Sequence, residues 1–225
     1  MLNHKTSISL KNKSADLCKH VAISALVANF LLSTSLVRAD EANDTIAKWP
    51  AEAQKAAKSM IEIHGAPGEV TPTMLVWHDS GPWKLIIASN IETQHNFPGP
   101  HKDTVEEFVS YKVPESKLEE LALFDGSVNI DKTRGEMSAR CDAEHHNIVA
   151  LNLAHDIIIG KRSVKDARAY YTKVVMAEKK ENKLDDYMKK LNFKPHLNTE
   201  NPDKISPEML PMVRAMEKEA GKAKN

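Results

Sequence analysis

The sequence predicts an α+β fold with an N-terminal helix, a small antiparallel β-sheet, a C-terminal helical hairpin and a polar tail. Apolar residues recur at helical spacing over 51–64 and again after residue 138. Between them, a turn cluster separates two apolar runs that lie between residues 73 and 89. Helical and strand patterns that are grouped rather than alternating are typical of an α+β architecture.

The first helix is predicted over Ala51–His64. Pro50 stands just before it and Gly65 just after it, which is the usual asymmetry of helix ends. Alanine and methionine side chains form one apolar stripe along it. Residues 40–48 lack such a pattern, so we expect them to be a loose start of the domain.

Four strands are predicted in the middle of the chain. Thr73–His78 and Trp83–Ser89 flank the turn cluster DSGP and form a hairpin. Residues 94–103 are expected to be a loop because its two prolines lack backbone donors. Residues 104–113 alternate between apolar and polar side chains, as in a half-buried strand, and another strand surrounds Val128 and Ile130.

The C-terminal half is predicted to be helical. A short helix follows Pro114, a long one runs from Ser138 to about Ile159, and Ser163 caps a third over 164–179. We therefore expect a single α+β domain over 40–178. Residues 179–225 are rich in Lys, Glu, Asn and Pro, so they are predicted to be a polar, partly disordered tail with a short amphipathic helix near 209–220.

Residues 1–39 have the pattern of a signal peptide. A segment with four lysines precedes an uncharged run, Val21–Val37, and Val37-Arg38-Ala39 puts compact residues where a signal peptidase reads them. We expect cleavage near Ala39-Asp40 and export. Polar residues interrupt the run, whereas a stable span needs about 20 mostly apolar residues. An uncleaved N-terminal anchor in the inner membrane, with the rest of the chain outside the cytoplasm, is the alternative.

Cleavage would leave a mildly acidic protein. The whole chain has 31 basic and 31 acidic residues. Residues 1–39 hold five of the basic residues and one of the acidic ones, so 26 and 30 remain, a net charge of −4. Such a mixed surface lacks the basic footprint of a nucleic-acid-binding protein. We therefore expect no nucleic-acid partner and no stable membrane span after cleavage.

Four motifs carry a resemblance to known proteins. They are GPWK at 81–84, FDGSV at 124–128, TRGEMSARCD at 133–142 and NLAHDI at 152–157. Over roughly residues 60–175 the chain resembles a group of uncharacterised proteobacterial exported proteins. The resemblance implies a bacterial, periplasmic protein, and it carries over no catalytic residue.

Cys141 and His145 form the first candidate site. Four residues apart on the predicted helix, they lie one turn from each other and could share a metal ion. A thiol near a helix N-terminus is also expected to have a lowered pKa. Zinc needs three or four ligands, so His95, His101 and His155 are the candidates for the rest. A buried thiol and ordinary hydrogen-bonded histidines are the alternative.

Trp77, His78, Trp83 and Lys84 form the second candidate site. They flank the predicted hairpin turn and could form a surface for a small ligand or a partner protein. Packing of the two tryptophans against a helix is the alternative.

Several classes of enzyme lack their usual motifs. The sequence has no P-loop, no dinucleotide-binding glycine pattern, no G-x-S-x-G, no H-E-x-x-H and no C-x-x-C. We therefore expect a non-enzymatic binding or accessory protein without a cofactor, whose partner is an unknown protein or small ligand. A metal-binding or redox-responsive protein centred on Cys141 and His145 is the alternative.

Overall fold

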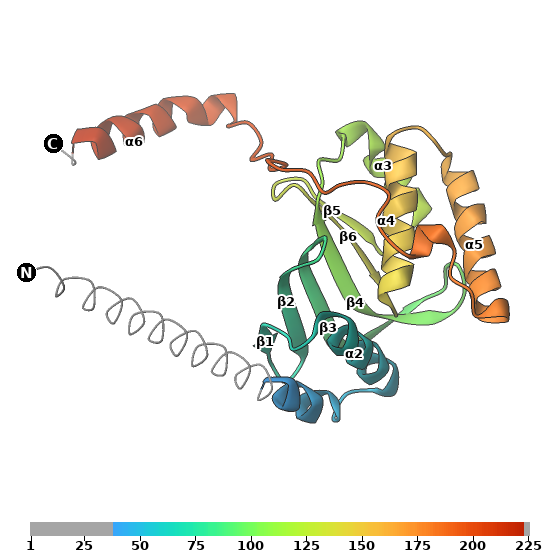
Figure 1. Cartoon of the computed structure of the whole chain (residues 1–225). Coiled ribbons are helices and arrows are strands. Elements are labelled where there is room, and N and C mark those ends of the chain that lie inside the picture. The colour runs from blue at the N-terminus through green and yellow to red at the C-terminus, as the bar shows by residue number, and fades with distance from the viewer. Residues whose placement is uncertain (1–37, 223–225) are drawn as a thin grey trace, which may run out of the picture. The chain divides into compact units, whose positions relative to one another are not determined.

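The computed structural model describes residues 38–222 and has the predicted α+β fold (Figure 1). The principal helices are α2 (Ala51–His64), α3 (Leu118–Phe124), α4 (Glu144–Ile158), α5 (Val164–Glu181) and α6 (Leu210–Lys222). The strands are β1 (Glu69–Val70), β2 (Met74–Ser80), β3 (Trp83–His95), β4 (His101–Ser110), β5 (Val128–Asp131) and β6 (Glu136–Cys141). They form one sheet in the order β1-β2-β3-β4-β6-β5. The predicted signal peptide lies outside the described residues except for Arg38 and Ala39.

The chain divides into two compact units. Unit 1 comprises the described residues up to Glu107 together with Arg140–Asn147, and unit 2 comprises Phe108–Ala139 and the described residues from Ile148 onwards. The division passes through β4, β6 and α4, so each of these elements contributes residues to both units. None of the helices among residues 38–222 is long and apolar enough to cross a membrane.

In unit 1, helix α2 packs against the β2–β3 hairpin (Figure 1). Its small buried face consists of Ala53, Ala56, Ala57 and Met60. The hairpin is antiparallel, with Leu75 opposite Ala88. Gly81 makes its turn at φ +60°, a conformation that glycine adopts without steric cost. The predicted helix and hairpin are therefore both confirmed.

Three of the predicted boundaries are wrong. Residues 38–46 are helical rather than loose, and they bury Ala42 and Ile46 completely. The loop predicted over 94–103 is shorter, because β3 continues to His95 and β4 already begins at His101. The helix predicted from Ser138 begins only at Glu144.

The late start of α4 has a clear cause. Ser138 pairs with Asn129 in the antiparallel β5–β6 ladder, where the backbone bonds to a neighbouring strand. Such pairing depends on a distant segment of the chain. The periodicity of side chains within one segment therefore does not predict it. As a consequence, Cys141 ends a strand and does not lie on the helix.

In unit 2, helix α3 packs against α5 and β5. The rings of Phe124 and Tyr171 are 6.4 Å apart, and Arg168 Nη1 donates a hydrogen bond to the Phe124 carbonyl oxygen at 2.5 Å. Helix α5 begins as predicted, because Ser163 Oγ accepts a hydrogen bond from the Asp166 amide at 3.1 Å.

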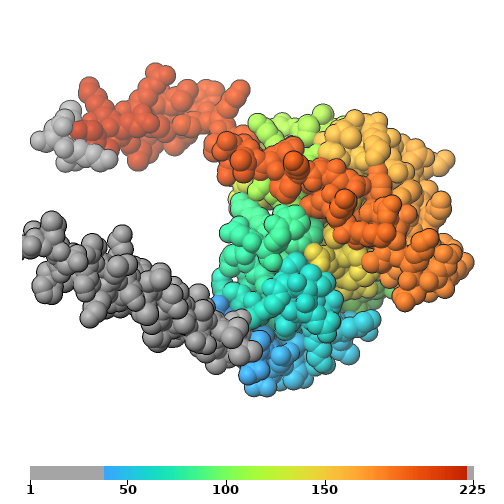
Figure 2. All heavy atoms as spheres, viewed as in Figure 1, coloured from blue at the N-terminus to red at the C-terminus, as the bar shows by residue number. Residues whose placement is uncertain are grey.

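The chain that follows α5 is held on unit 2 by hydrogen bonds. Asn152 Nδ2 donates to the carbonyl oxygens of Tyr187 and Lys190, both at 2.9 Å. The His196 amide donates to Ser110 O at 2.9 Å, and the Asn201 amide donates to Thr133 O at 3.2 Å. Figure 2 shows this segment, in orange, lying on the surface of unit 2. The polar tail thus has ordered contacts up to residue 201, and its amphipathic helix is α6.

Candidate metal centre

Two histidines and an aspartate converge where β3 ends and β4 begins. Five residues connect His95 to His101, so the adjoining strand ends bring the two rings to a centroid distance of 4.9 Å. Asp103 lies two residues further along β4, on the same side as His101 because side chains alternate along a strand. Its Oδ1 is 3.1 Å from His101 Nε2 and 3.5 Å from His95 Nδ1.

The tautomer of His101 is set by the backbone. Its Nδ1 lies 2.8 Å from the Gly99 carbonyl oxygen, which can only accept a hydrogen bond, so Nδ1 carries the proton. Nε2 therefore faces the Asp103 carboxylate. Burial opposes the charged ring, but the hydrogen bonds to Asp103 and Gly99 and the charge of Asp142 outweigh it and raise the pKa of His101.

Cys141 adjoins this group from the end of β6. Its Sγ is 3.2 Å from His101 Nε2 and 3.4 Å from Asp142 Oδ1. Burial and the charge of Asp142 raise the pKa of the thiol well above its ordinary value. The expected lowering of this pKa by a helix N-terminus is therefore wrong, because Cys141 does not lie on the helix. A protonated, buried thiol is a poor nucleophile.

A second group of donors surrounds the same thiol. His146 Nδ1 lies 2.6 Å from Asp142 Oδ1. Burial opposes ionisation of Asp142, but its hydrogen bond to His146 and the charges of His146 and His101 hold its pKa well below the ordinary range. Cys141, Asp142 and His146 have ligand atoms that all lie within 4.8 Å of one another.

The structure unites some of the predicted metal ligands and separates others. His95, His101 and Cys141 lie together, although Cys141 and His95 are 46 residues apart in the chain. Of the two adjacent histidines at the start of α4, His146 rather than His145 is grouped with Cys141. His155 belongs to unit 2, where its Nδ1 is 2.7 Å from Tyr111 Oη and its ring stacks on Phe193. Burial lowers the pKa of His155.

The structure does not bring the four hairpin residues of the second candidate site onto one surface. Trp77 is 3% exposed and Trp83 is 1% exposed, whereas His78 and Lys84 are exposed. Both indole N–H groups have partners. Trp77 Nε1 donates to the Gly65 carbonyl oxygen at 3.0 Å, and Trp83 Nε1 donates to Glu144 Oε1 at 2.8 Å.

Comparison of the chain with protein-family models, with curated proteins and with solved structures found no match. The geometry of unit 1 is therefore the basis for the functional conclusion. Of the residues in this second group, the sequence does not single out Asp142 as a candidate ligand. The four-residue spacing of Asp142 and His146 could have indicated their contact, because side chains four residues apart face each other at the start of a helix.

Proposed function

We propose that this protein is an exported, periplasmic protein that binds a divalent transition-metal ion, with Zn²⁺ the ion that its donor chemistry fits best. His95, His101 and Asp103 would hold the ion, and Cys141 would supply the fourth donor. The observation that carries the proposal is the convergence of two imidazoles and a carboxylate, with ligand atoms all within 4.8 Å of one another, beside a thiol.

The distances support a small tetrahedral ion. Donors bound to one tetrahedral Zn²⁺ at its usual bond lengths of about 2.0–2.3 Å lie about 3.3–3.8 Å from one another. The separations of 3.1 Å, 3.2 Å and 3.5 Å around His101 and Asp103 are close to this range. Modest side-chain rotations would therefore complete the coordination, with Cys141 Sγ moving towards the other three donors.

The surroundings of the donors support the proposal as well. A metal-ligating histidine usually donates its second ring N–H to a backbone carbonyl or a carboxylate. His101 does this through Gly99 O, and Arg140 Nε lies 3.8 Å from Asp103 Oδ2. Four protein donors leave no open coordination position, which favours a binding or accessory role over hydrolytic catalysis.

Zn²⁺ affinity is expected to fall as the pH falls. The pKa values of His101 and Cys141 are raised, so each group keeps its proton to a higher pH than an ordinary histidine or cysteine, and the ion must displace any proton that is present. The affinity should therefore decrease about tenfold per pH unit for each displaced proton. Below the pKa of His101, binding of the ion displaces both the imidazole proton and the thiol proton. Above that pKa, it displaces only the thiol proton. Calorimetric titration at several pH values, in buffers of different ionisation enthalpy, measures the protons released. Affinity independent of pH, without proton release, would contradict this coordination.

The variant His101→Ala should lose metal binding. It removes a side chain that contacts both Asp103 and Cys141, so the affinity should drop at least about 100-fold. We would titrate the protein with Co²⁺, whose absorption spectrum reports tetrahedral coordination and a thiolate ligand. His78→Ala is the matched control because His78 is exposed and pairs with Glu69. Unchanged Co²⁺ binding in His101→Ala would refute the proposal.

A further inference from the structure

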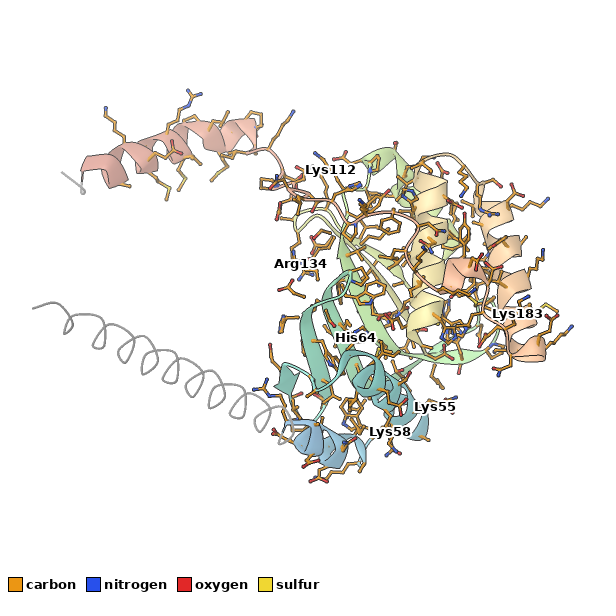
Figure 3. All side chains as sticks on the ribbon, in the orientation of Figure 1. Lys55, Lys58, His64, Lys112, Arg134 and Lys183 are labelled. Atoms are coloured by element: carbon orange, nitrogen blue, oxygen red, sulfur yellow. The ribbon has the colours of Figure 1, made fainter. Side chains whose placement is uncertain are left out.

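A second cluster of ionisable side chains lies elsewhere in unit 1. His64 ends helix α2, Glu107 lies on β4 and Glu144 begins α4, and their ligand atoms all lie within 4.8 Å of one another. Figure 3 labels His64 at the end of its helix. Asp103 and Glu107 are four residues apart on β4, which corresponds to about 13 Å along a strand. The cluster is therefore separate from the site around His101.

Glu107 is the most unusual member of the cluster. It is fully buried, and Asn147 Nδ2 donates to its Oε2 at 2.9 Å. Its other oxygen, Oε1, has no hydrogen-bond partner within the described part of the chain. A buried polar atom without a partner costs about 1–3 kcal/mol and calls for an explanation, such as an ion or a water molecule.

His64 presents a second unsatisfied atom to the same cluster. Its Nδ1 is 3.0 Å from Ser80 Oγ, which fixes the ring. Its Nε2 is buried and lies 3.5 Å from Glu144 Oε1, and it makes no hydrogen bond among the described residues. Two elements distant in the chain thus contribute a buried, unsatisfied ligand atom each, His64 Nε2 and Glu107 Oε1.

We propose that His64, Glu107 and Glu144 form a second, independent site for a divalent cation, and that its donor set suits Mn²⁺. Two carboxylates favour a hard ion, while a single imidazole is accepted by Mn²⁺ more readily than by Mg²⁺ or Ca²⁺. The ion would satisfy the buried atoms of Glu107 and His64 at once.

Two neighbouring groups would position the ligands. Asn147 Nδ2 donates hydrogen bonds to Glu107 Oε2 and, at 3.1 Å, to the Val105 carbonyl oxygen. The second bond fixes the amide to β4, the strand that carries Glu107. Trp83 Nε1 donates to Glu144 Oε1 at 2.8 Å. Such hydrogen bonds to ligating carboxylates are typical of the outer shell of metal sites.

The test is a Mn²⁺ titration followed by electron paramagnetic resonance, in which bound Mn²⁺ loses the six-line signal of the free ion. The His101→Ala variant serves as the background, because it removes the site around His101. We expect one Mn²⁺ per chain in this background, with the affinity at least about 100-fold weaker after the added change Glu107→Gln. The added change His64→Ala tests the same site from a second element. Glu62→Gln, an exposed residue of the same helix as His64, is the control.

The outcomes separate the two sites. Retention of Mn²⁺ in the His101→Ala background, with loss on either added change, supports the second site whatever happens to Zn²⁺. Absence of Mn²⁺ binding in that background would overturn the second site. Mn²⁺ affinity that neither Glu107→Gln nor His64→Ala weakens, relative to the His101→Ala background, would overturn it as well. A thermal melt of each metal-free variant shows that it is folded, so that loss of binding is assigned to the site.

Discussion

The variant Gly135→Ala should lose about 2–5 kcal/mol of unfolding free energy. Gly135 has φ +63°, where a residue with a Cβ atom costs about 1–2 kcal/mol. The added Cβ would also clash with the Thr199 carbonyl group and approach the Glu200 backbone nitrogen at 2.6 Å. Overpacking of this kind costs about 1–3 kcal/mol. Urea denaturation followed by circular dichroism measures the loss.

Gly126→Ala is the matched control for this experiment. A Cβ at Gly126 meets nothing within 4 Å, and its backbone does not require glycine. We expect its stability to change by less than about 0.5 kcal/mol, as for other surface substitutions. Should Gly135→Ala instead be as stable as the unmodified protein, the segment around Thr199 would not lie against the turn, and the ordered contacts of the tail would be wrong.

The variant Trp83→Ala should be the most destabilised of those considered, by about 3–5 kcal/mol. Trp83 is 1% exposed, so its truncation leaves a large cavity, and Glu144 loses the indole N–H donor. Trp83→Phe keeps most of the buried area and loses the hydrogen bond, so a smaller loss is expected. Thermal melts of both variants separate the contribution of packing from that of the hydrogen bond. A Trp83→Ala protein that melts like the original would contradict the packing of Trp83 in the core.

The parts of the fold that the sequence predicts well are those with local signals. Pro50 and Gly65 mark both ends of α2, and Ser163 marks the start of α5. The β2–β3 hairpin is equally local, since its turn residues lie between its strands. Each of these elements depends on residues within one segment, so the pattern of that segment is sufficient.

The parts that the sequence does not predict depend on distant segments. The residues around Ser138 read as the start of a helix, yet they pair with β5. The tail is fixed mainly through backbone groups, as in the hydrogen bond from His196 to Ser110, and such bonds leave little trace in side-chain composition. In both cases tertiary pairing overrides the local pattern.

The candidate site divides in the same way. His95 and His101 could be predicted as a pair because they bracket a short proline-containing connection. The partnership of Cys141 with His101 could not, because it requires β6 and β4 to lie next to each other in the sheet. Once Cys141 is placed on a strand, the one-turn argument that linked it to His145 no longer applies.

The most direct test of the proposed metal centre is native mass spectrometry of the protein purified, without chelators, from cells that produce it. We predict a chain that begins at Asp40 and retains one Zn²⁺, which the His101→Ala variant lacks and the His78→Ala variant keeps. We also expect the bound Zn²⁺ to be released when the sample is acidified, because His101 and Cys141 then regain their protons. A chain without stoichiometric zinc, or one whose zinc survives His101→Ala, would contradict the proposed metal centre.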